Sequence, residues 1–501
     1  MRRIAIALLA ATTLTRLAAA PPGKSQAGPD PAADAALERE VKRVIDIYSI
    51  MESNAADPVN PEQAFYQGAI PGLLRKLDPH SVFFDPGQFE QLKQMQSSTR
   101  KGFGSVVSLL PGRVIVLQAL PGTPSARSGI SPGDEILAIN NIRLDRLELE
   151  QLIELLGQAR EQPAQLVVRR PGNARLMELR LTPEEMQSPS VERAFLLRPG
   201  VGYLRVGSFD EATGRDIKAG IEKLGGRKLH GLVLDLRNNP GGLVTAALET
   251  ASLFLNPGQT IFSIRGRKSA AEQETVPRQA EPYTFPVSII LNGKSASASE
   301  IVAGALQDHD RATILGEPSF GKGLVQSVFP LSSGTGIALT TALYYTPSGR
   351  SIQKPLNAGD YELGEASAHL NADKTFHTDK GRSVQGGGGI TPDQVVYPAV
   401  PSRLRAALEA SGSFVSFATE YLAAEKVDAA FDVTPALLDR FQAWLAERKI
   451  QPSFGEWARE RDFVQLRLKA EIFNQALGVD KGDEVDALQD PQIQKALEAL
   501  P

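Results

Sequence analysis

The chain has 501 residues, of which 42% are hydrophobic and 22% charged, the composition of a folded protein with room for about three domains. Its net charge of −4 argues against a broad nucleic-acid-binding surface, so no nucleic-acid partner is expected. The chain contains no cysteine, which excludes disulfides, thiol nucleophiles and thiolate metal sites but indicates neither redox compartment.

The N-terminus has the layout of a secretory signal peptide over residues 1–20. A basic start is followed by a mostly apolar stretch at 4–14 and by small residues that end at Ala20. Arg16 interrupts the apolar character, which leaves an uncleaved membrane anchor as the alternative. No later segment reaches the ~20 apolar residues of a membrane span. We therefore expect a periplasmic or otherwise exported protein, with membrane contact only if the N-terminal segment is uncleaved.

Residues 21–33 are rich in Pro, Gly and Ala and are expected to form a linker. Residues 34–98 are predicted to be helical, because apolar residues recur there at three- and four-residue steps. His80 lies between these helices and suggests a catalytic residue. No serine or carboxylate motif accompanies it, so the preferred interpretation is a turn in which Asp78 and Ser81 bond to the backbone.

Residues 99–183 form a compact unit, in which short predicted strands surround an amphipathic helix at 147–159. This order resembles a PDZ domain, most specifically at the loop Gly102-Phe103-Gly104-Ser105 and at 133–140. In such domains loop amides hold a peptide's C-terminal carboxylate, and the peptide adds a strand to the sheet. The resemblance implies that Gly102, Phe103, Gly104 and Ser105 bind substrate; the alternative is that the glycines only permit a tight turn. A polar connector at 183–190 is expected to follow.

Strands and helices alternate in residues 191–400, which predicts an α/β core with a largely parallel sheet. Ligands of such sheets belong at the carboxyl ends of the strands. The Gly241-Gly242 turn follows one apolar strand, at 232–236, and a serine-rich run follows another, at 287–291. Residues 401–501 are predicted to form several amphipathic helices, with Trp444 and Trp457 in core or subunit contacts.

The serine-rich run offers three candidate nucleophiles, Ser295, Ser297 and Ser299. At a strand-to-helix turn a hydroxyl can stand beside unpaired backbone N–H groups. A serine needs a base before it attacks a carbonyl, and the glycine-flanked Lys322 can serve if burial lowers its pKa from about 10.4 by a few units. The residues alone do not choose among the three serines.

The sequence supports catalysis by histidine or by a metal less well than catalysis by a serine and a lysine. None of the five histidines lies in a motif that suggests a Ser-His-Asp arrangement. Asp308 and Asp310 flank His309 and suggest a metal site, but a polar helix end with solvated carboxylates is the preferred interpretation. No metal site and no cofactor is predicted.

Several long motifs resemble, in the same order, the C-terminal processing peptidases, also called tail-specific proteases, which are serine-lysine peptidases with a PDZ domain. The motifs cover roughly residues 35–400 and lie at 77–81, 235–242, 295–300, 316–323, 344–353 and 389–393. The resemblance implies that Ser297 is the nucleophile, Lys322 the general base and Gln326 the residue that orients the lysine. It also implies an oxyanion site formed by backbone N–H groups, those of Ala298, Gly241 and Gly242. Lys294 departs from the pattern, where a small or uncharged residue is expected, and receives no catalytic role.

The expected fold is therefore multidomain α/β, with an α/β peptidase core at 191–400, an inserted PDZ domain at 99–183 and helical regions at 34–98 and 401–501. The expected function is an exported serine endopeptidase that binds protein C-terminal tails. A non-catalytic peptide-binding scaffold with the same fold is the alternative. The expected partners are proteins or peptides with accessible C-termini, and the sequence leaves a homo-oligomer or an adaptor open.

Overall fold

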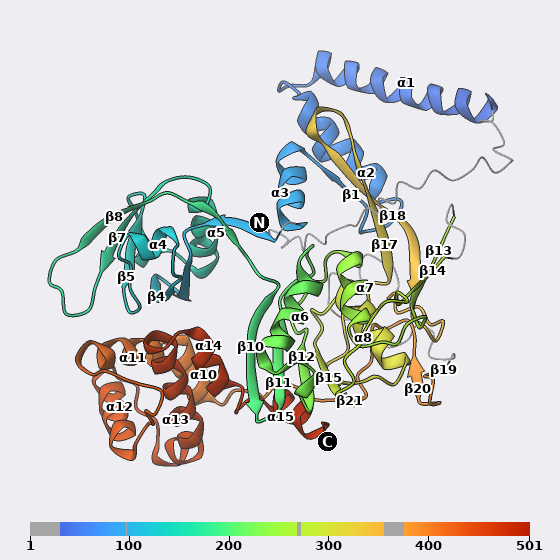
Figure 1. Cartoon of the computed structure of the whole chain (residues 1–501). Helices are drawn as coiled ribbons and strands as arrows, with labels where there is room; N and C mark the ends of the chain where they lie inside the picture. The colour runs from blue at the N-terminus through green and yellow to red at the C-terminus, as the bar shows by residue number, and fades with distance from the viewer. Residues whose placement is uncertain (1–30, 97, 268–271, 355–374, 501) are drawn as a thin grey trace.

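The computed structural model describes residues 31–96, 98–267, 272–354 and 375–500 (Figure 1). The signal peptide expected over residues 1–20, and all of the expected linker up to residue 30, lie outside the described residues. Within the described ranges, no helix combines the length and the apolar character that crossing a bilayer requires.

The N-terminal region is helical, and its one short strand belongs to a sheet of the peptidase-like region. Strand β1 pairs antiparallel with β18, which lies more than 250 residues later in the chain. Asn60 caps the helical segment that follows it, because its Oδ1 accepts hydrogen bonds from the backbone N–H groups of Glu62 and Gln63. The first helix starts at Pro31, within the stretch expected to be a linker. The elements are α1 (Pro31–Asn54), η1 (Gln63–Ala69), α2 (Ile70–Leu74), β1 (Val82–Phe84) and α3 (Pro86–Gln96).

The PDZ-like unit has its own hydrophobic core between the helix α5 and a sheet of strand order β3-β4-β5-β7-β8. The expected connector at 183–190 instead contains the strand β9, which pairs antiparallel with β2. The chain segments that enter and leave the unit are therefore hydrogen-bonded to each other. The elements are β2 (Thr99–Gly102), β3 (Ser105–Leu110), β4 (Arg113–Ala119), α4 (Pro124–Arg127), β5 (Glu135–Ile139), β6 (Ile142–Arg143), η2 (Leu144–Arg146), α5 (Leu149–Ala159), β7 (Ala164–Arg169), β8 (Met177–Leu181) and β9 (Glu184–Gln187).

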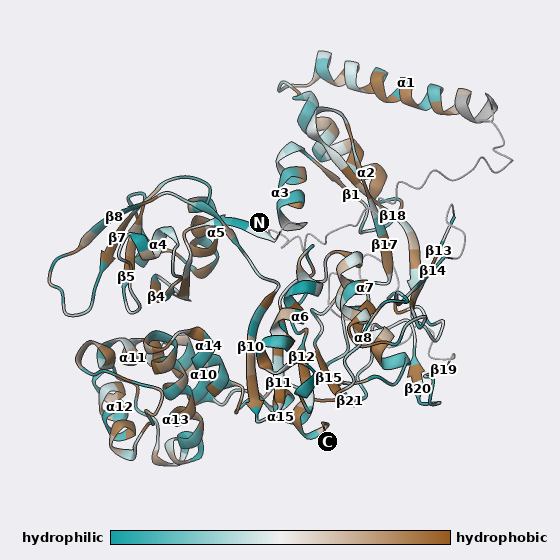
Figure 2. Cartoon of the chain, viewed as in Figure 1, coloured by the Kyte–Doolittle hydropathy of each residue, from teal (hydrophilic) through white to brown (hydrophobic). Residues whose placement is uncertain are grey.

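The predicted parallel sheet is present, with strand order β10-β11-β12-β15-β16-β21. Its strands are parallel except for β10, which is antiparallel to β11. All residues of β12 and β15 are buried, as expected for strands covered on both faces, and Figure 2 shows their hydrophobic character. The strands are β10 (Val191–Arg198), β11 (Val201–Val206), β12 (Gly231–Asp235), β15 (Val287–Leu291), β16 (Ala312–Gly316) and β21 (Gln394–Val395).

Helices cover the two faces of this sheet in different ways. One core forms with the helices α6, α7 and α8, which follow strands of the sheet itself. The other core forms with the last helix, α15, whose Ile493 and Ala496 share a cluster with Val233 and Ile290 of the strands. The C-terminal end is thus part of the core. The helices are α6 (Thr213–Leu224), α7 (Val244–Ser252), α8 (Ala298–Asp308) and α15 (Pro491–Glu498), with η3 (Gly226–Lys228) after α6.

A second, antiparallel sheet lies beside the first and contains β1, β18, β13 and β14, with β17 also paired to β18. The remaining C-terminal helices pack around their own core, which includes Trp444 and Trp457, as predicted. The elements are β13 (Thr260–Gly266), β14 (Glu272–Thr275), β17 (Leu324–Pro330), η4 (Ser332–Gly334), β18 (Gly336–Tyr345), β19 (Thr375–His377), β20 (Ser383–Gln385), α10 (Arg403–Ala410), α11 (Ser413–Ala424), α12 (Pro435–Glu447), α13 (Phe454–Ala476) and α14 (Val479–Asp486).

Candidate active site

The serine-rich run forms the turn between the buried strand β15 and the N-terminus of α8. Ser297 immediately precedes the helix and has φ 54° and ψ −114°, a backbone conformation that is strained for a residue with a side chain. Such strain persists only where the surroundings impose it, and it is common at functional sites. The turn therefore holds Ser297 in a conformation that the local sequence does not favour.

Hydrogen bonds distinguish the three candidate serines. The hydroxyl of Ser295 donates to the carbonyl of Leu236 at 2.8 Å, and that of Ser299 donates to the carbonyl of Asn239 at 3.1 Å. Both side chains are fully buried, whereas Ser297 is 7% exposed. Ser295 and Ser299 thus tie the turn to the end of the neighbouring strand, and Ser297 is the serine that a substrate can reach most easily.

Glu300 links the serine turn to the segment that carries Lys322. Its carboxylate is completely buried and accepts four hydrogen bonds. One oxygen, Oε2, accepts from the backbone N–H groups of Ser297 and Lys322 at 2.8 and 2.9 Å. The other, Oε1, accepts from the Gly321 N–H at 2.7 Å and from the Ser319 hydroxyl at 2.5 Å. The backbones of Ser297 and Lys322 therefore lie within two hydrogen-bond lengths of each other.

The amine of Lys322 is buried and is held by Gln326. Lys322 Nζ donates to Gln326 Oε1 at 2.6 Å, and the side chain of Lys322 is only 2% exposed. Burial lowers the pKa of Lys322 to about 8, although the charges of Glu300 and Asp78 act in the opposite direction. At pH 7 roughly a tenth of the amine is thus neutral and able to accept a proton, far more than for a lysine with the ordinary pKa of about 10.4.

The turn at 77–81 contacts this pair from the N-terminal region. Asp78 Oδ1 accepts hydrogen bonds from the N–H groups of His80 and Ser81, which confirms the predicted turn. The carbonyl of His80 also accepts from Gln326 Nε2 at 2.6 Å, so the opposite end of the amide, Oε1, faces Lys322. Burial lowers the pKa of the His80 imidazole to about 4, with the charge of Lys322 adding to the effect.

Sequence reasoning did not identify Glu300 or the His80 carbonyl as parts of the site. Glu300 lies three residues after Ser297, which is the spacing of a helix capping box, and this was the available signal. The His80 contact spans 246 residues and has no local signature.

The Gly241-Gly242 turn lies directly beside Ser297. A Cβ atom on Gly241 would lie 2.6 Å from the Ala296 carbonyl oxygen and 2.8 Å from the Ala298 nitrogen. The φ angle of Gly241 is 93°. Only glycine fits at this position. The N–H of Gly241 donates to Asn239 Oδ1 at 2.8 Å, so this predicted oxyanion donor already serves the turn.

The predicted substrate loop Gly102-Phe103-Gly104-Ser105 borders a separate groove of about 260 Å³ in the PDZ-like unit. Apolar residues of the unit, including Leu156 and Ile139, line the same groove. Gly104 has φ 77°, and a Cβ there would clash with Thr123. The structure therefore provides a loop beside an apolar groove, in a different unit from Ser297.

The residues around His309 are held by ion pairs and hydrogen bonds. Asp308 is buried and pairs with the buried Arg350 at 2.8 Å, and Asp310 pairs with Arg382 at 2.5 Å. The expectation of solvated carboxylates was therefore wrong for both residues, since the side chain of Asp310 is only 5% exposed. Among the described residues, no group of three or more His, Asp and Glu side chains is placed to hold a metal ion.

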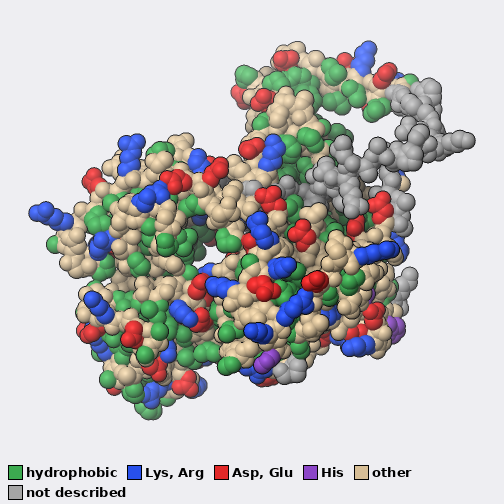
Figure 3. Space-filling view, in the orientation of Figure 1, with side chains coloured by type: hydrophobic (Ala, Val, Ile, Leu, Met, Phe, Trp, Pro, Cys, Tyr) green, Lys and Arg blue, Asp and Glu red, His purple; other side chains and the backbone are tan. Residues whose placement is uncertain are grey.

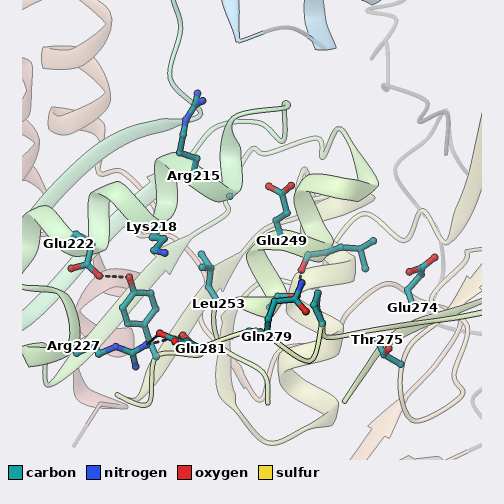
Figure 4. A pocket seen from close by; sticks show the side chains of 16 residues that line it. Arg215, Lys218, Glu222, Arg227, Glu249, Leu253, Glu274, Thr275, Gln279 and Glu281 are labelled. Carbon is teal, nitrogen blue, oxygen red and sulfur yellow. Dashed lines mark hydrogen bonds and ion pairs between the residues drawn. The ribbon is translucent and has the colours of Figure 1, made fainter. Parts of the chain in front are cut away.

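A larger cavity of about 810 Å³ lies between α6, α7 and residues 274–283 (Figure 4). None of the predicted site residues lines it. Several of its charged groups have partners within the cavity wall, because Glu222 accepts from the Tyr283 hydroxyl and Arg227 pairs with Glu281 at 3.5 Å. It offers no nucleophile or base of the kind found at the serine turn.

Comparisons with known proteins identify the families of the two units. Residues 200–363 match Peptidase family S41, and residues 115–170 match the PDZ domain. The chain is 36% identical over 323 residues to the carboxy-terminal-processing protease of Bartonella bacilliformis, a match that covers 63% of this chain and 73% of that protein. It is 33% identical over 321 residues to carboxyl-terminal-processing peptidase 2, chloroplastic, of Arabidopsis thaliana, with 61% of this chain and 62% of that protein covered.

A solved structure, the photosystem II D1 C-terminal processing protease, is similar at 24% identity and a TM-score of 0.39, over 73% of this chain and 93% of that one. The two family matches fall on the parallel sheet and on the PDZ-like unit. Together with the helices of the N- and C-terminal regions, these matches confirm the predicted fold class, an α/β peptidase core with an inserted PDZ domain and helical regions at both ends.

Proposed function

Because the chain belongs to the carboxy-terminal-processing proteases of peptidase family S41 and is a serine-type peptidase with a PDZ domain, we propose that it cleaves proteins selected by their C-terminal tails. In this proposal Ser297 is the nucleophile, Lys322 is the general base, and Gln326 orients the lysine. Peptide recognition is assigned to residues 99–183 and catalysis to residues 191–400.

One observation carries the proposal: the amine of Lys322 is buried, has a pKa lowered to about 8, and is held by Gln326 beside the turn of Ser297. A lysine on the surface would be an ammonium ion with no capacity to accept a proton. The shared carboxylate of Glu300 keeps the two catalytic segments together.

The proposed reaction follows acyl-transfer chemistry. Neutral Lys322 accepts the hydroxyl proton of Ser297, and the serine oxygen forms a bond to the peptide carbonyl carbon. When the tetrahedral intermediate collapses, the peptide C–N bond breaks and the Lys322 ammonium gives its proton to the leaving amine. A water molecule then loses a proton to Lys322, and its oxygen bonds to the acyl carbon. The ester C–O bond to Ser297 breaks, the Lys322 ammonium returns the proton to the serine oxygen, and the product acid leaves.

The oxyanion of the intermediate needs backbone donors beside Ser297. The N–H of Ala298, the first residue of α8, is one of the helix groups without an intrahelical acceptor. Gly241 and Gly242 were both expected to contribute. Since the Gly241 N–H donates to Asn239, we assign the second donor to Gly242.

Recognition of a tail is assigned to the groove beside Gly102, Phe103, Gly104 and Ser105. The loop amides would hold a C-terminal carboxylate, and the apolar lining would take an apolar terminal side chain.

Export to the periplasm rests on the signal peptide expected over residues 1–20. Mass spectrometry of the secreted protein should give a mass lower than that of the full chain by the mass of residues 1–20.

The test compares the wild type with Ser297→Ala and Lys322→Ala on an unfolded substrate with an apolar C-terminus. Each substitution should lower kcat/KM by at least about 10³-fold, because the nucleophile and its base act as a unit. Substantial activity in either variant would overturn the dyad.

Two neighbouring variants serve as controls. Lys294→Ala removes an exposed lysine of the same turn and should leave activity unchanged. Ser299→Ala removes one hydrogen bond to Asn239 and should cost less than about tenfold. If the wild type binds peptides but shows no turnover, the alternative of a non-catalytic scaffold is correct.

A further inference from the structure

The N-terminal region places a buried turn beside Lys322, although most of the region projects from the molecule. Its helices stand at one end of the structure, and hydrophobic side chains are visible along the outermost of them, α1 (Figures 1 and 3). In the turn at residues 77–81, by contrast, Asp78 and Ser81 are buried. A buried carboxylate requires hydrogen bonds that replace its water, so the partners of Asp78 indicate what the turn does.

Asp78 organises the turn through both oxygens of its carboxylate. Oδ1 accepts hydrogen bonds from the backbone N–H groups of His80 and Ser81 at 2.7 and 2.8 Å, and Oδ2 accepts from the Ser81 hydroxyl at 2.7 Å. The backbone bonds fix the peptide planes on both sides of His80. The carbonyl of His80 lies in the second of these planes, because it shares a peptide group with the Ser81 N–H. Asp78 therefore sets the direction in which that carbonyl points.

The turn is also in register with the strand that carries Gln326. It directly precedes β1, which pairs with β18. Thr340 of β18 is the partner of Gln326 in the ladder between β17 and β18, and its N–H donates to the Ser81 hydroxyl at 3.2 Å. The register of that ladder shifts between Val325 and Gln326, an irregularity of the kind that re-aims a side chain. The His80 carbonyl and the Gln326 amide are thus brought together from segments 246 residues apart.

The His80 carbonyl decides which end of the Gln326 amide faces Lys322. A glutamine amide has a donor, Nε2, and an acceptor, Oε1, whereas a carbonyl oxygen can only accept. The His80 oxygen therefore takes the Nε2 end at 2.6 Å and leaves Oε1 to accept from Lys322 Nζ at 2.6 Å. This orientation matters because a neutral amine has one lone pair. Oε1 binds an N–H of the amine and leaves the lone pair for the Ser297 proton, whereas an Nε2 group in the same place would donate to the lone pair and block it.

The carboxylate of Asp78 also acts on Lys322 through its charge. Burial lowers the pKa of Lys322, and the charge of Asp78 opposes this effect, as that of Glu300 does to a larger extent. The titratable side chains on the segments around the amine are Glu300, Asp78, His80, Tyr344 and Lys354. Burial lowers the pKa of His80 to about 4 and raises that of Tyr344, so both stay neutral where Lys322 titrates. Removal of the Asp78 charge should therefore lower the pKa of Lys322 further.

We propose that Asp78 is a positioning residue for the general base, which fixes the amide of Gln326 through the His80 carbonyl and acts on the Lys322 amine through its charge. The N-terminal region thereby completes the active site of the peptidase core. Asp78 acts through other side chains and is not itself a catalytic residue. This role rests on the proposed function, since it assumes that Lys322 is the base.

Two variants of Asp78 separate its hydrogen bonds from its charge. Asp78→Ala removes the bonds that hold the turn and should lower kcat by between about 10-fold and 100-fold, because the Gln326 amide is no longer fixed. Asp78→Asn can accept the same backbone bonds, so its kcat above the midpoint of the pH profile should stay within about threefold of the wild type. Without the negative charge, that midpoint should fall by about half a pH unit or more. A merely structural role would lower the free energy of unfolding in urea and leave the midpoint in place.

The matched control is Asp85→Ala. Asp85 lies in the same region and accepts a hydrogen bond from the Gln88 N–H at 2.8 Å at the start of α3. Its substitution should leave kcat and the midpoint unchanged. A double-mutant cycle with Gln326→Ala isolates the route. If Asp78 acts through Gln326, Asp78→Ala should cost less than about threefold in kcat when Gln326 is already alanine.

The role of Asp78 would be overturned by a kcat in Asp78→Ala equal to that of the wild type, or by an unmoved midpoint in Asp78→Asn. It would also be overturned if Asp78→Ala costs as much in the Gln326→Ala variant as in the wild type. If Asp78→Ala does not fold, the midpoint of Asp78→Asn decides. Failure of the dyad itself has a different signature, which is activity that survives in Ser297→Ala or Lys322→Ala.

Discussion

The serine turn and the loop of the peptide groove each follow a strand, but the two loops are held in different ways. The serine turn is bonded to segments far away in the chain: Ser295 and Ser299 contact residues 236–239, and Glu300 contacts residues 319–322. The described hydrogen bonds of the groove loop stay inside the PDZ domain, where Gly104 accepts from Leu120 and Phe103 accepts from Ser125.

This difference predicts at which of the two loops a substitution should change activity and stability together. Residues of the serine turn share partners, so a change at one displaces the others, and effects on activity and stability should appear together. The groove is built by one unit with its own core, so a change there should alter substrate binding and leave the chemistry intact. Three predictions test this contrast.

Of these three predictions, the largest effect is expected from Glu300→Gln. The glutamine has nearly the same shape, but its NH₂ group would face two donors in place of one carboxylate oxygen, which leaves buried N–H groups unsatisfied. We expect kcat/KM to fall at least about 100-fold and the free energy of unfolding to fall by about 2–4 kcal/mol. Peptidase assays and urea unfolding measure both quantities.

The matched control is Glu281→Gln, which makes the same change at an exposed side chain of the cavity in Figure 4. It should leave activity and stability close to those of the wild type. If Glu300→Gln behaves like this control, the carboxylate does not hold the site together.

The same contrast explains how much of the site the sequence could predict. The strands β12 and β15 are continuous apolar runs followed by glycine- and serine-rich turns, so a parallel sheet with a site at its carboxyl end could be inferred from local pattern. The resemblance then selected Ser297, Lys322 and Gln326. Nothing local indicates that Gln326 bonds to His80, because that contact depends on the pairing of β1 with β18.

Long-range pairing also explains the errors elsewhere in the fold. The segment 183–190 is polar enough for a connector, and β9 forms there because β2 supplies its partner. The amphipathic helix α15 gives no sign in its sequence of which surface it covers, and only the folded chain places it on the sheet. The PDZ domain was easier to predict, because its core is contained in one short stretch of chain.

A smaller effect, confined to the serine site, is expected from pH. Since the neutral amine of Lys322 is the proposed base and its pKa is about 8, the neutral fraction rises as pH increases. Below that value kcat/KM should rise about tenfold per pH unit, and above it the rate should level off. A pH profile measured with a substrate that has no group titrating in this range would show the midpoint.

Gln326→Glu sharpens the pH test. A carboxylate beside the amine favours the ammonium form, so the midpoint should move upward by about one pH unit or more. Leu156→Ala in the groove should leave the midpoint in place, since Lys322 is not among the residues that line the groove. A wild-type profile that is flat, or that falls, from roughly pH 6 to 9 would exclude a neutral lysine as the base.

The smallest effect, and the one that separates binding from chemistry, is expected from Leu156→Ala. Leu156 lines the groove from α5, and its truncation removes apolar surface that a terminal side chain would cover. For a substrate with an apolar C-terminus, KM should rise about fivefold to tenfold while kcat stays unchanged, because the contact is the same before and during reaction.

Ile153→Ala is the matched control, because it lies on the same helix, is 54% exposed and does not line the groove. The decisive comparison uses the same substrate with its C-terminal carboxylate converted to an amide. If the loop amides bind the carboxylate, the amide should have a raised KM with the wild type, and Leu156→Ala should add little to it. If Leu156→Ala lowers kcat equally for the carboxylate and the amide substrate, the groove acts on the serine site. The groove would then not be a unit that works independently of the hydrogen-bond network around Ser297.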